Sequence, residues 1–275
     1  MNKVMVFISL LALLTVFLIG CGKETSSERK EKKKIIVATS PGPYSELFLK
    51  AVKPILEEKG YTIEDKQFTE LLQADVALSE GEVDLNVDQH SAYMNTFNEN
   101  KNANLVSLTP VPTVPAAIFP GRKTSLDHVK KGDAIGIPND PSNAARGYAL
   151  LQKAKLIKLK DGIELVKATA EDVVENPYHL KIVEMDSATI PRSLTDLDYG
   201  VIPGSIVYAS KLDPELSLLA EDVLEKFELV AVVNEANKDT KWAKDVIAAY
   251  QSKEFKKYMD ENNKHGYWYI PDELK

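Results

Sequence analysis

Short apolar segments alternate with helical segments along most of this chain, and their order limits the possible fold more than any other feature. A run of four to eight apolar residues is typical of a buried strand, whereas apolar residues three and four apart are typical of a helix. We expect strands at residues 35–39, 62–68, 83–87, 134–137, 180–185, 199–202 and 227–234. We expect helices at residues 44–59, 69–79, 91–98, 143–154, 190–195, 241–250 and 253–262.

This order predicts an α/β fold with mixed or mostly parallel sheets, flanked by helices and joined by right-handed crossovers. Closely spaced prolines interrupt the alternation at residues 105–119, and prolines at that density are not expected inside a sheet. We therefore predict two lobes with a ligand cleft between them, as the length of 275 residues permits. The predicted limits are 35–112 with 229–275 for lobe I and 113–228 for lobe II, with crossing segments near 109–117 and 226–232.

The first 34 residues indicate a targeting signal and a tether. Lys3 precedes an apolar run at residues 4–19 that is shorter than a membrane-spanning helix requires. Residues 18–21 resemble a bacterial lipobox, in which the cysteine is acylated and becomes the mature N-terminus. This predicts a signal peptide at 1–20, lipidation (palmitate) at Cys21, and a charged, disordered tether at 21–34. An uncleaved signal anchor with an incidental cysteine is the alternative.

Composition and motifs argue against several classes of function. A hydrophobic content of 44% and a charged content of 27% are typical of a soluble globular protein. The formal charge of −7 leaves no basic excess for a phosphate backbone, so no nucleic-acid partner is expected. The chain has no Gly-x-Ser-x-Gly elbow, P-loop or dinucleotide-binding glycine motif, so we expect no enzyme, catalytic residue or cofactor. Asp88 with His90 would supply only half a metal site, and no metal is predicted.

One stretch, at residues 137–147, combines features of an anion receptor. A strand ends in a Pro-Asn-Asp-Pro turn, after which Ser142 is the expected N-cap of the next helix. Asn143 and Arg146 lie three residues apart, so both point the same way from the first helical turn. An amide, a guanidinium and a helix N-terminus together could receive a small carboxylate. A capped surface helix with a solvated arginine is the alternative.

His90 and Tyr93 follow another predicted buried strand and lie three residues apart at a helix start. Residues at the carboxyl ends of parallel strands line ligand clefts, so both side chains could face the cleft beside Arg146. The alternative is structural, with a histidine that caps the turn and a half-buried tyrosine.

With these motifs in view, the sequence resembles the NlpA-type methionine-binding lipoproteins, the substrate-binding components of methionine ABC importers. The matching segments are TSPGP (39–43), GEVDLN (81–86), QH (89–90) with Tyr93, IPNDPSN (137–143) with Arg146 and Gly147, LIKLKDG (156–162) and ENP (175–177). The resemblance implies the two-lobed periplasmic-binding-protein fold. It also implies that Arg146 grips the ligand carboxylate while Asn143, His90 and Tyr93 complete the polar shell.

Three positions depart from the family pattern. Leu71 replaces a tyrosine, Asp88 replaces a phenylalanine, and Ser205 replaces an asparagine that helps to hold the ligand's amino-acid backbone. Loss of aromatic contacts to a thioether would weaken methionine binding, and a nearby uncompensated carboxylate would weaken it further. We therefore expect an altered side-chain pocket, in which Asp88 selects a polar or cationic group. The alternative is that Asp88 turns outward and Leu71 closes an ordinary methionine pocket.

The predicted function is that of a monomeric receptor, lipid-anchored at the cell membrane on its extracytoplasmic face. It would close its lobes over an amino acid, either methionine or a related amino acid or short peptide, and deliver the ligand to the membrane-embedded permease of an ABC importer. Two other classes remain open: a lipoprotein enzyme that uses the same cleft, and a non-transport surface lipoprotein for adhesion or scaffolding. The three replacements lend weight to the second of these.

Overall fold

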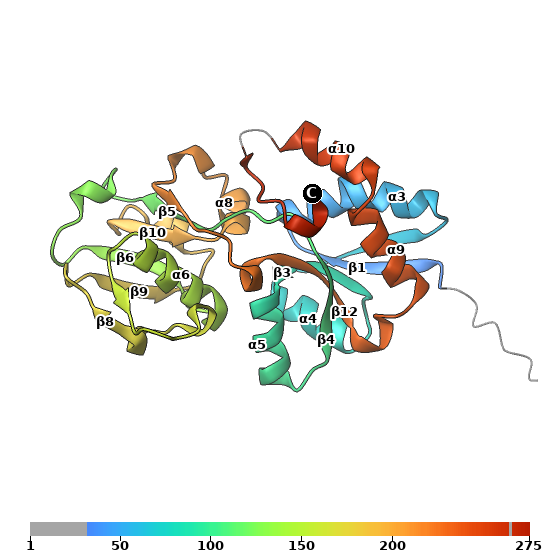
Figure 1. Ribbon diagram of the computed structural model, residues 1–275, viewed down its shortest axis with the longest axis horizontal. Helices are drawn as coiled ribbons and strands as arrows, with labels where there is room; N and C mark the ends of the chain where they lie inside the picture. Colours follow the sequence, from blue (N-terminus) through green and yellow to red (C-terminus); the bar gives the residue numbers. More distant parts are fainter. Residues whose placement is uncertain (1–31, 264–265) are drawn as a thin grey trace, which may run out of the picture. The chain divides into compact units, whose positions relative to one another are not determined.

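The structure is a computed structural model, and it describes residues 32–263 and 266–275 (Figure 1). The predicted signal peptide, the lipidation site Cys21 and residues 22–31 of the predicted tether lie outside the described residues. Residues Lys33–Lys275 form one compact unit. Within the described part of the chain, no helix is both long enough and apolar enough to span a membrane.

The first sheet has five strands in the order β2-β1-β3-β12-β4. Its strands are β1 (Lys34–Thr39), β2 (Thr62–Gln67), β3 (Leu85–His90), β4 (Leu105–Pro110) and β12 (Leu229–Asn234). β1 pairs in parallel with β2 and β3, whereas β12 is antiparallel to β3 and β4. The sheet is therefore mixed, because the chain returns from the second sheet to insert β12 in the opposite direction.

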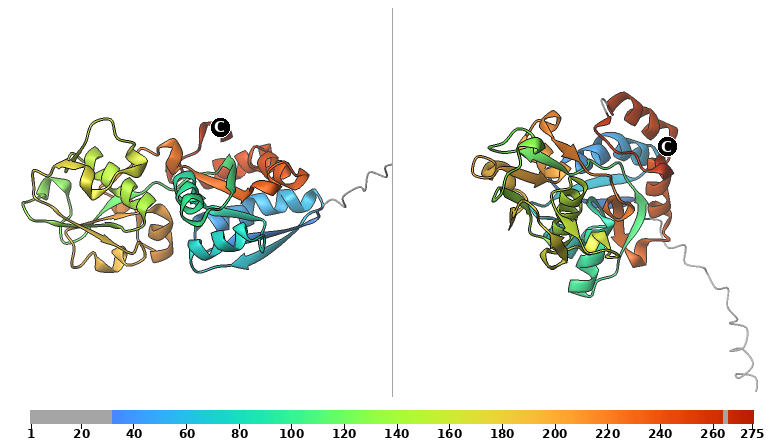
Figure 2. Two further views of the ribbon diagram at one scale, coloured as in Figure 1. Left: turned by 90° about the horizontal axis from the view of Figure 1, so that it is seen from below. Right: turned by 60° about the vertical axis from the view of Figure 1, so that its left-hand side comes forward.

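Residues of β1 alternate between two hydrophobic cores, as the two-residue period of a strand requires. Ile35 and Val37 face the core formed with α2 (Pro43–Leu47), α3 (Lys53–Glu58), α9 (Lys241–Tyr250) and α10 (Lys253–Asn262). Ala38 faces the opposite core, formed with α4 (Leu71–Ser79) and α5 (Ser91–Lys101). Both faces of the sheet are thus covered by helices (Figures 1 and 2).

The second sheet has the order β11-β5-β10-β6-β9. Its strands are β5 (Ala117–Pro120), β6 (Ala134–Pro138), β9 (Lys181–Met185), β10 (Tyr199–Ile202) and β11 (Leu219–Ala220). β6 pairs in parallel with β9 and β10, and β5 is antiparallel to β10 and β11. The helix α6 (Pro141–Lys153) packs on one face, and α7 (Ile190–Ser193) and α8 (Gly204–Ser210) pack on the other.

The remaining elements are short. They are the hairpin of β7 (Lys158–Leu159) and β8 (Val173–Glu175), and the 3₁₀ turns η2 (Leu126–His128), η3 (Leu165–Lys167), η4 (Ala170–Asp172), η5 (Pro214–Leu216), η6 (Glu225–Phe227), η7 (Glu235–Asn237) and η9 (Asp272–Leu274). The predicted helix at 44–59 is continuous, but a π-helical stretch, η1 (Phe48–Val52), separates α2 from α3. Pro54, at the start of α3, cannot donate a backbone hydrogen bond, which accounts for the local change of helical pitch.

The expectation that the proline-rich residues 105–119 would stay outside a sheet is wrong. β4 and β5 both lie within or overlap this segment, and only residues 111–116 connect the two sheets. Pro110 and Pro120 are the last residues of their strands, where a missing backbone N–H interrupts little pairing. The return segment is residues 221–228, earlier than predicted, because residues 229–234 form the buried strand β12. The limits assigned to the two lobes from the sequence stay a prediction.

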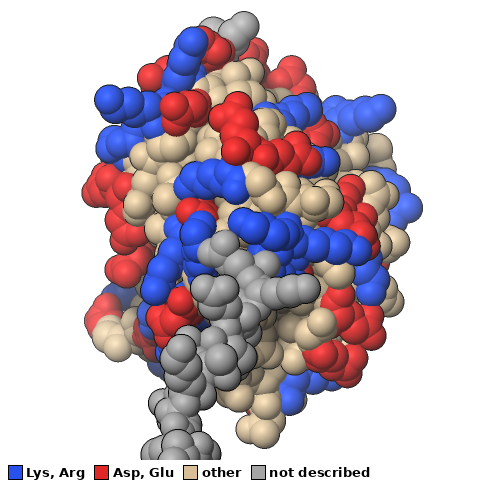
Figure 3. Space-filling model, turned by 90° about the vertical axis from the view of Figure 1, so that its right-hand side faces the viewer, with Lys and Arg blue, Asp and Glu red and all other residues tan. Residues whose placement is uncertain are grey.

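The face drawn in Figure 3 carries interspersed basic and acidic side chains rather than a patch of one sign. Surface ion pairs among the described residues, such as Lys34–Glu64 and Lys59–Asp245, are part of this mixed distribution. Charge on this face is therefore locally balanced.

Candidate functional site

A cavity of about 460 Å³ lies between loops of the two sheets. It is the larger of the two cavities described below, and its volume falls within the range of small-molecule sites. All of the site residues predicted from the sequence line it: Arg146, Asn143, His90, Tyr93, Asp88, Leu71 and Ser205. The fold thus gathers residues from Ser40 to Leu229, far apart in the sequence, around one space.

The lining segments share one topological position. They follow the carboxyl ends of parallel strands: residues 40–44 after β1, 69–72 after β2, 88–90 at the end of β3, 139–146 after β6, 186–188 after β9 and 203–206 after β10. In open α/β sheets, ligands bind at this edge. Leu71 is the first residue of α4, and Ser205 lies in the first turn of α8.

The start of α6 differs from the prediction. Asp140, not Ser142, is the N-cap, and its Oδ1 accepts a hydrogen bond from the backbone N–H of Asn143 at 3.1 Å. The Asn143 Nδ2 donates to both Asp140 oxygens, at 3.1 and 3.2 Å, and the Ser142 hydroxyl lies 3.1 Å from Oδ1. Pro141 occupies the first helical turn, which its fixed φ favours. The Asp140 carboxylate therefore occupies the anion position at the N-terminus of α6.

His90 joins the two sides of the cavity. Its Nδ1 accepts a hydrogen bond from the backbone N–H of Tyr93 at 3.1 Å, so His90 is the N-cap of α5. Because Nδ1 is an acceptor, the ring proton belongs on Nε2, which donates to Asn143 Oδ1 at 3.2 Å. Burial, with a smaller contribution from the Arg146 charge, lowers the pKa of His90 to about 3, so the ring is neutral. His90 combines the structural and the cleft-lining positions that the sequence left as alternatives.

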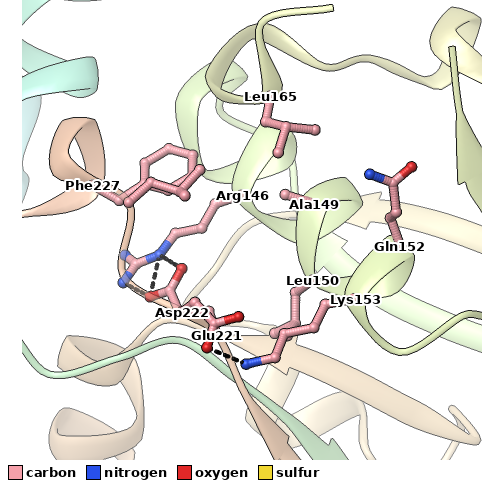
Figure 4. A pocket seen from close by; sticks show the side chains of 10 residues that line it. Arg146, Ala149, Leu150, Gln152, Lys153, Leu165, Glu221, Asp222 and Phe227 are labelled. Atoms are coloured by element: carbon pink, nitrogen blue, oxygen red, sulfur yellow. Dashed lines mark hydrogen bonds and ion pairs between the residues drawn. The ribbon is translucent and has the colours of Figure 1, made fainter. Parts of the chain in front are cut away.

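Arg146 is buried, with 3% of its surface exposed, and its guanidinium is paired with Glu221 (Figure 4). The Arg146 Nε donates to the two Glu221 oxygens at 2.8 and 2.7 Å, and Nη2 also donates to Oε1. The backbone N–H of Ala116 donates to the same Oε1 at 2.7 Å. Arg146 does line the predicted cleft, but its carboxylate partner in this structure is a side chain of the protein.

Glu221 was not predicted from the sequence. It follows the two-residue strand β11 and precedes Asp222, an arrangement that resembles ordinary surface acids. Arg146 and Glu221 also line a smaller cavity of about 170 Å³, together with Leu150, Leu165 and Phe227 (Figure 4). The Phe227 ring centroid lies 5.6 Å from the Arg146 guanidinium carbon, which is within cation–π range.

Asp88 lines the cavity and is held by neutral donors. Its Oδ2 accepts hydrogen bonds from the backbone N–H and the hydroxyl of Ser40, at 3.0 and 2.9 Å. The Ser45 hydroxyl lies 2.9 and 2.7 Å from its two oxygens. Burial raises the pKa of Asp88 to about 6, despite these hydrogen bonds. The side chain therefore does not turn outward into solvent, and it remains mainly ionised at neutral pH.

A second buried carboxyl group, Asp75 on α4, lies behind the site and was also not predicted. The Gln89 Nε2 donates to Asp75 Oδ1 at 2.5 Å and to Asn86 Oδ1 at 3.1 Å. Asn86 Oδ1 also accepts from the backbone N–H of Asp88, which fixes the orientation of the Asn86 amide and hence that of Gln89. Asp75 Oδ2 and Gln89 Oε1 have no hydrogen-bond partner among the described residues. A proton on Asp75 would allow its hydroxyl to donate to Gln89.

Asp88 and His90 were the two possible metal ligands noted in the sequence, and no third ligand lies with them among the described residues. Within residues 32–263 and 266–275, no three His, Cys, Asp or Glu side chains are grouped so that they could hold a metal ion. The two ring nitrogens of His90 and the oxygens of Asp88 take part in the hydrogen bonds described above. The geometry is that of a polar ligand cavity.

Replacing Arg146 should lower the stability of the protein, because it leaves the buried carboxylate of Glu221 without a counter-ion. We expect Arg146→Met to lower the free energy of unfolding by about 3–5 kcal/mol, because Glu221 would lose its charged partner. The double variant Arg146→Met/Glu221→Gln should recover a large part of this loss. Urea denaturation of the three proteins measures both effects. An additive result, in which the second substitution destabilises further, would contradict the coupling.

Asp75 should make stability depend on pH. Burial raises the pKa of Asp75 to about 7, and the nearby Asp88 adds to the rise, whereas the Gln89 hydrogen bond opposes it. A raised carboxyl pKa stabilises the fold below the unfolded pKa, near 3.9, and this contribution is lost as the pH rises through the folded value. The loss by pH 7 is on the order of 4 kcal/mol at most.

The test compares free energies of unfolding between pH 4 and pH 8 for the wild type and Asp75→Asn. The asparagine amide can donate to Gln89 at every pH, so the decline between pH 4 and pH 7 should be smaller in the variant. Asp88 stays in place, and loss of the neighbouring Asp75 charge would lower the pKa of Asp88 and so reduce the decline in the same direction. The exposed Asp239→Asn provides a control that should keep the wild-type profile. Parallel profiles for wild type and Asp75→Asn would show that Asp75 is ionised throughout.

Comparison with known proteins identifies close relatives of this chain. The NlpA lipoprotein family matches residues 35–270. The D-methionine-binding lipoprotein MetQ of Salmonella typhi is 35% identical over 240 residues, which cover 86% of this chain and 87% of the relative. The protein of the same name from Escherichia coli K12 is 34% identical over the same length.

Solved structures agree with this relationship. A methionine-binding protein, MetQ, has a TM-score of 0.78 at 32% identity, covering 88% of this chain and 99% of that structure. A Burkholderia cenocepacia nutrient-binding protein bound to methionine has a TM-score of 0.78 at 32% identity, covering 85% and 98%. The two-lobed α/β fold predicted from the sequence is confirmed, and the chain belongs to the NlpA lipoprotein family.

Proposed function

We propose that this protein is the extracytoplasmic substrate-binding component of an ABC importer, and that it captures an amino acid between its two lobes. The observation that carries the proposal is the 460 Å³ cavity, which lies at the carboxyl ends of parallel strands from both sheets. A ligand in this cavity would contact both lobes and stabilise the arrangement in which they close around it. The chemistry is binding and release, with no bond made or broken.

The names of relatives support an amino-acid ligand. Several are described as D-methionine-binding lipoproteins, one solved relative is bound to methionine, and another is described as an ABC transporter substrate-binding protein. We propose methionine, a related amino acid or a short peptide for this chain. The replacements at Leu71, Asp88 and Ser205 all face the cavity, so they would alter the pocket itself.

Roles for individual residues follow from the hydrogen bonds. Arg146 directs Nε and Nη2 to Glu221, so Nη1 is the guanidinium nitrogen available to a ligand carboxylate. Asn143 and His90 hydrogen-bond to each other in this structure, and we propose that each would instead hydrogen-bond to the ligand when it binds. Tyr93 lies beside His90, with the two ring centroids 6.4 Å apart, and would form the adjacent wall.

We also propose that acylation of Cys21 anchors the protein to the membrane, next to the permease that it serves. The membership in a lipoprotein family supports an anchored, extracytoplasmic location. The charged segment at residues 22–33, which precedes β1, would then act as a spacer between the anchor and the ligand-binding body. We propose that the protein acts as a monomer.

His90→Asn tests the site with little risk to the fold. Asparagine is a favourable N-cap, so α5 should be retained, but its side chain is too short to replace Nε2 in the cavity. We expect the variant to stay folded, with a modest loss of thermal stability from the lost contacts with Asn143 and Phe227, and to lose about tenfold in ligand affinity, the worth of one buried hydrogen bond. Isothermal titration calorimetry with D- and L-amino acids and dipeptides measures the affinity.

His128→Asn is the matched control, because His128 is exposed and does not line the cavity. Equal affinities for His90→Asn and the wild type would contradict the assignment of the site. A wild-type protein that gains no thermal stability with any amino acid or dipeptide would contradict the proposed function. That outcome would favour a non-transport surface lipoprotein.

A further inference from the structure

The charge of the ligand can be inferred from how the cavity's own charges are paired. Arg146 is the only lysine or arginine among the described residues that line the cavity. Its partner Glu221 is as deeply buried, with the side chains 4% and 6% exposed (Figure 4). Since the two charges are adjacent in a region that water screens poorly, Glu221 largely cancels the field of Arg146. His90 is neutral, so the lining offers no uncompensated positive charge.

Four carboxylates line the same cavity: Glu70, Asp88, Asp140 and Asp186. Glu70 and Asp88 belong to the side of the first sheet, and Asp140 and Asp186 to the side of the second. None of the four is in an ion pair with a described residue, whereas acids elsewhere on the body are commonly paired, as Glu64 and Asp245 are. The cavity therefore differs from the mixed surface seen in Figure 3.

Hydrogen bonds do not remove this negative charge. Asp88 is held by Ser40 and Ser45, and Asp140 is held by Asn143 and the start of α6. Neutral donors of this kind stabilise an ionised carboxylate and leave its net charge unchanged. Two ionised groups that approach from opposite sides of one cavity repel each other unless a cation lies between them.

We propose that the cavity selects an amino acid or short peptide with a net positive charge, that is, one with a basic group besides its α-ammonium. This inference rests on the proposed function and specifies its substrate class. The ligand carboxylate would contact Arg146 Nη1, while the basic side chain would lie toward Asp88. Glu70 and Asp186 are exposed and screened by water, whereas Asp88 and Asp140 are half-buried. A neutral zwitterion would therefore leave mainly the charges of Asp88 and Asp140 without compensation.

The test compares lysine and ornithine with norleucine and methionine by calorimetric titration at pH 8. Norleucine matches the aliphatic part of lysine and lacks the side-chain ammonium, so the pair isolates the effect of one charge. At this pH Asp88 is ionised, because burial raises its pKa only to about 6. We expect lysine or ornithine to bind at least tenfold more tightly than norleucine. We also expect that preference to weaken as NaCl is raised from 20 to 500 mM.

Asp88→Asn should reduce the preference for lysine about tenfold, since asparagine keeps the size of the side chain and an acceptor for the serines. Glu261→Gln removes one negative charge from the exposed surface of α10, outside the cavity lining, and should leave the preference unchanged. Glu221→Gln restores the uncompensated charge of Arg146, so it should shift the preference toward norleucine. Thermal unfolding verifies that each variant is folded, and Asp186→Asn, which also removes a carboxylate of the cavity lining, replaces Asp88→Asn if that variant is not folded.

The outcomes separate the two proposals. Norleucine or methionine binding as tightly as lysine would overturn the inference about charge and leave the proposed function in place. Loss of the lysine preference in Glu261→Gln as well as in Asp88→Asn would overturn the assignment to the cavity. No binding of any amino acid or dipeptide by the folded protein would overturn both.

Discussion

The buried ion pair between Arg146 and Glu221 links the candidate site to the segments that join the two sheets. Arg146 projects from α6, whereas Glu221 begins the return segment at residues 221–228. Glu221 is also tied to Ala116 of the outgoing segment: its side chain accepts from the Ala116 N–H, and its own N–H donates to the Ala116 carbonyl at 3.0 Å. One carboxylate therefore holds both connecting segments and the cation of the cavity.

This arrangement has a mechanical consequence. At the first sheet, the same two segments are joined again, because Leu229 accepts from the Val111 N–H and donates to the Thr113 hydroxyl. Any change in the angle between the lobes must be absorbed by the few residues between these two ties, 114–115 and 222–228. Motion there would move Glu221 and with it the guanidinium of Arg146. The position of the cation and the angle between the lobes are thus physically coupled.

The sequence was sufficient for those features that depend on local pattern. Hydrophobic periodicity located most of the strands and helices but missed β4, β5, β11 and α8, and the order of elements placed the carboxyl ends of the predicted parallel strands around one cleft. This is why His90, Asn143 and Arg146 could be expected near one another. The cap of α6 could also have been found, because a proline at the first helical position identifies the preceding Asp140 as the N-cap.

Features that depend on distant partners could not be predicted in this way. Glu221 is 75 residues from Arg146, and Ser40 is 48 residues from Asp88. A surface acid and a buried counter-ion have the same local sequence, so only the folded chain distinguishes them. The prolines of the crossing segment were misjudged for a related reason. Their effect depends on whether a proline falls inside a strand or at its end, and that depends on pairing with β12 and β10.

The environment of Asp88 shows how a charged residue can line a ligand cavity without a counter-ion of its own. An ionised carboxylate in an apolar pocket would be strongly destabilising. Here two serines and one backbone N–H supply its hydrogen bonds, so the protein needs no cation at this position. The negative charge is stabilised locally and still acts across the cavity. Because the hydrogen bonds from Ser40 and Ser45 are neutral, Asp88 keeps its negative charge, and that charge acts on a ligand in the cavity.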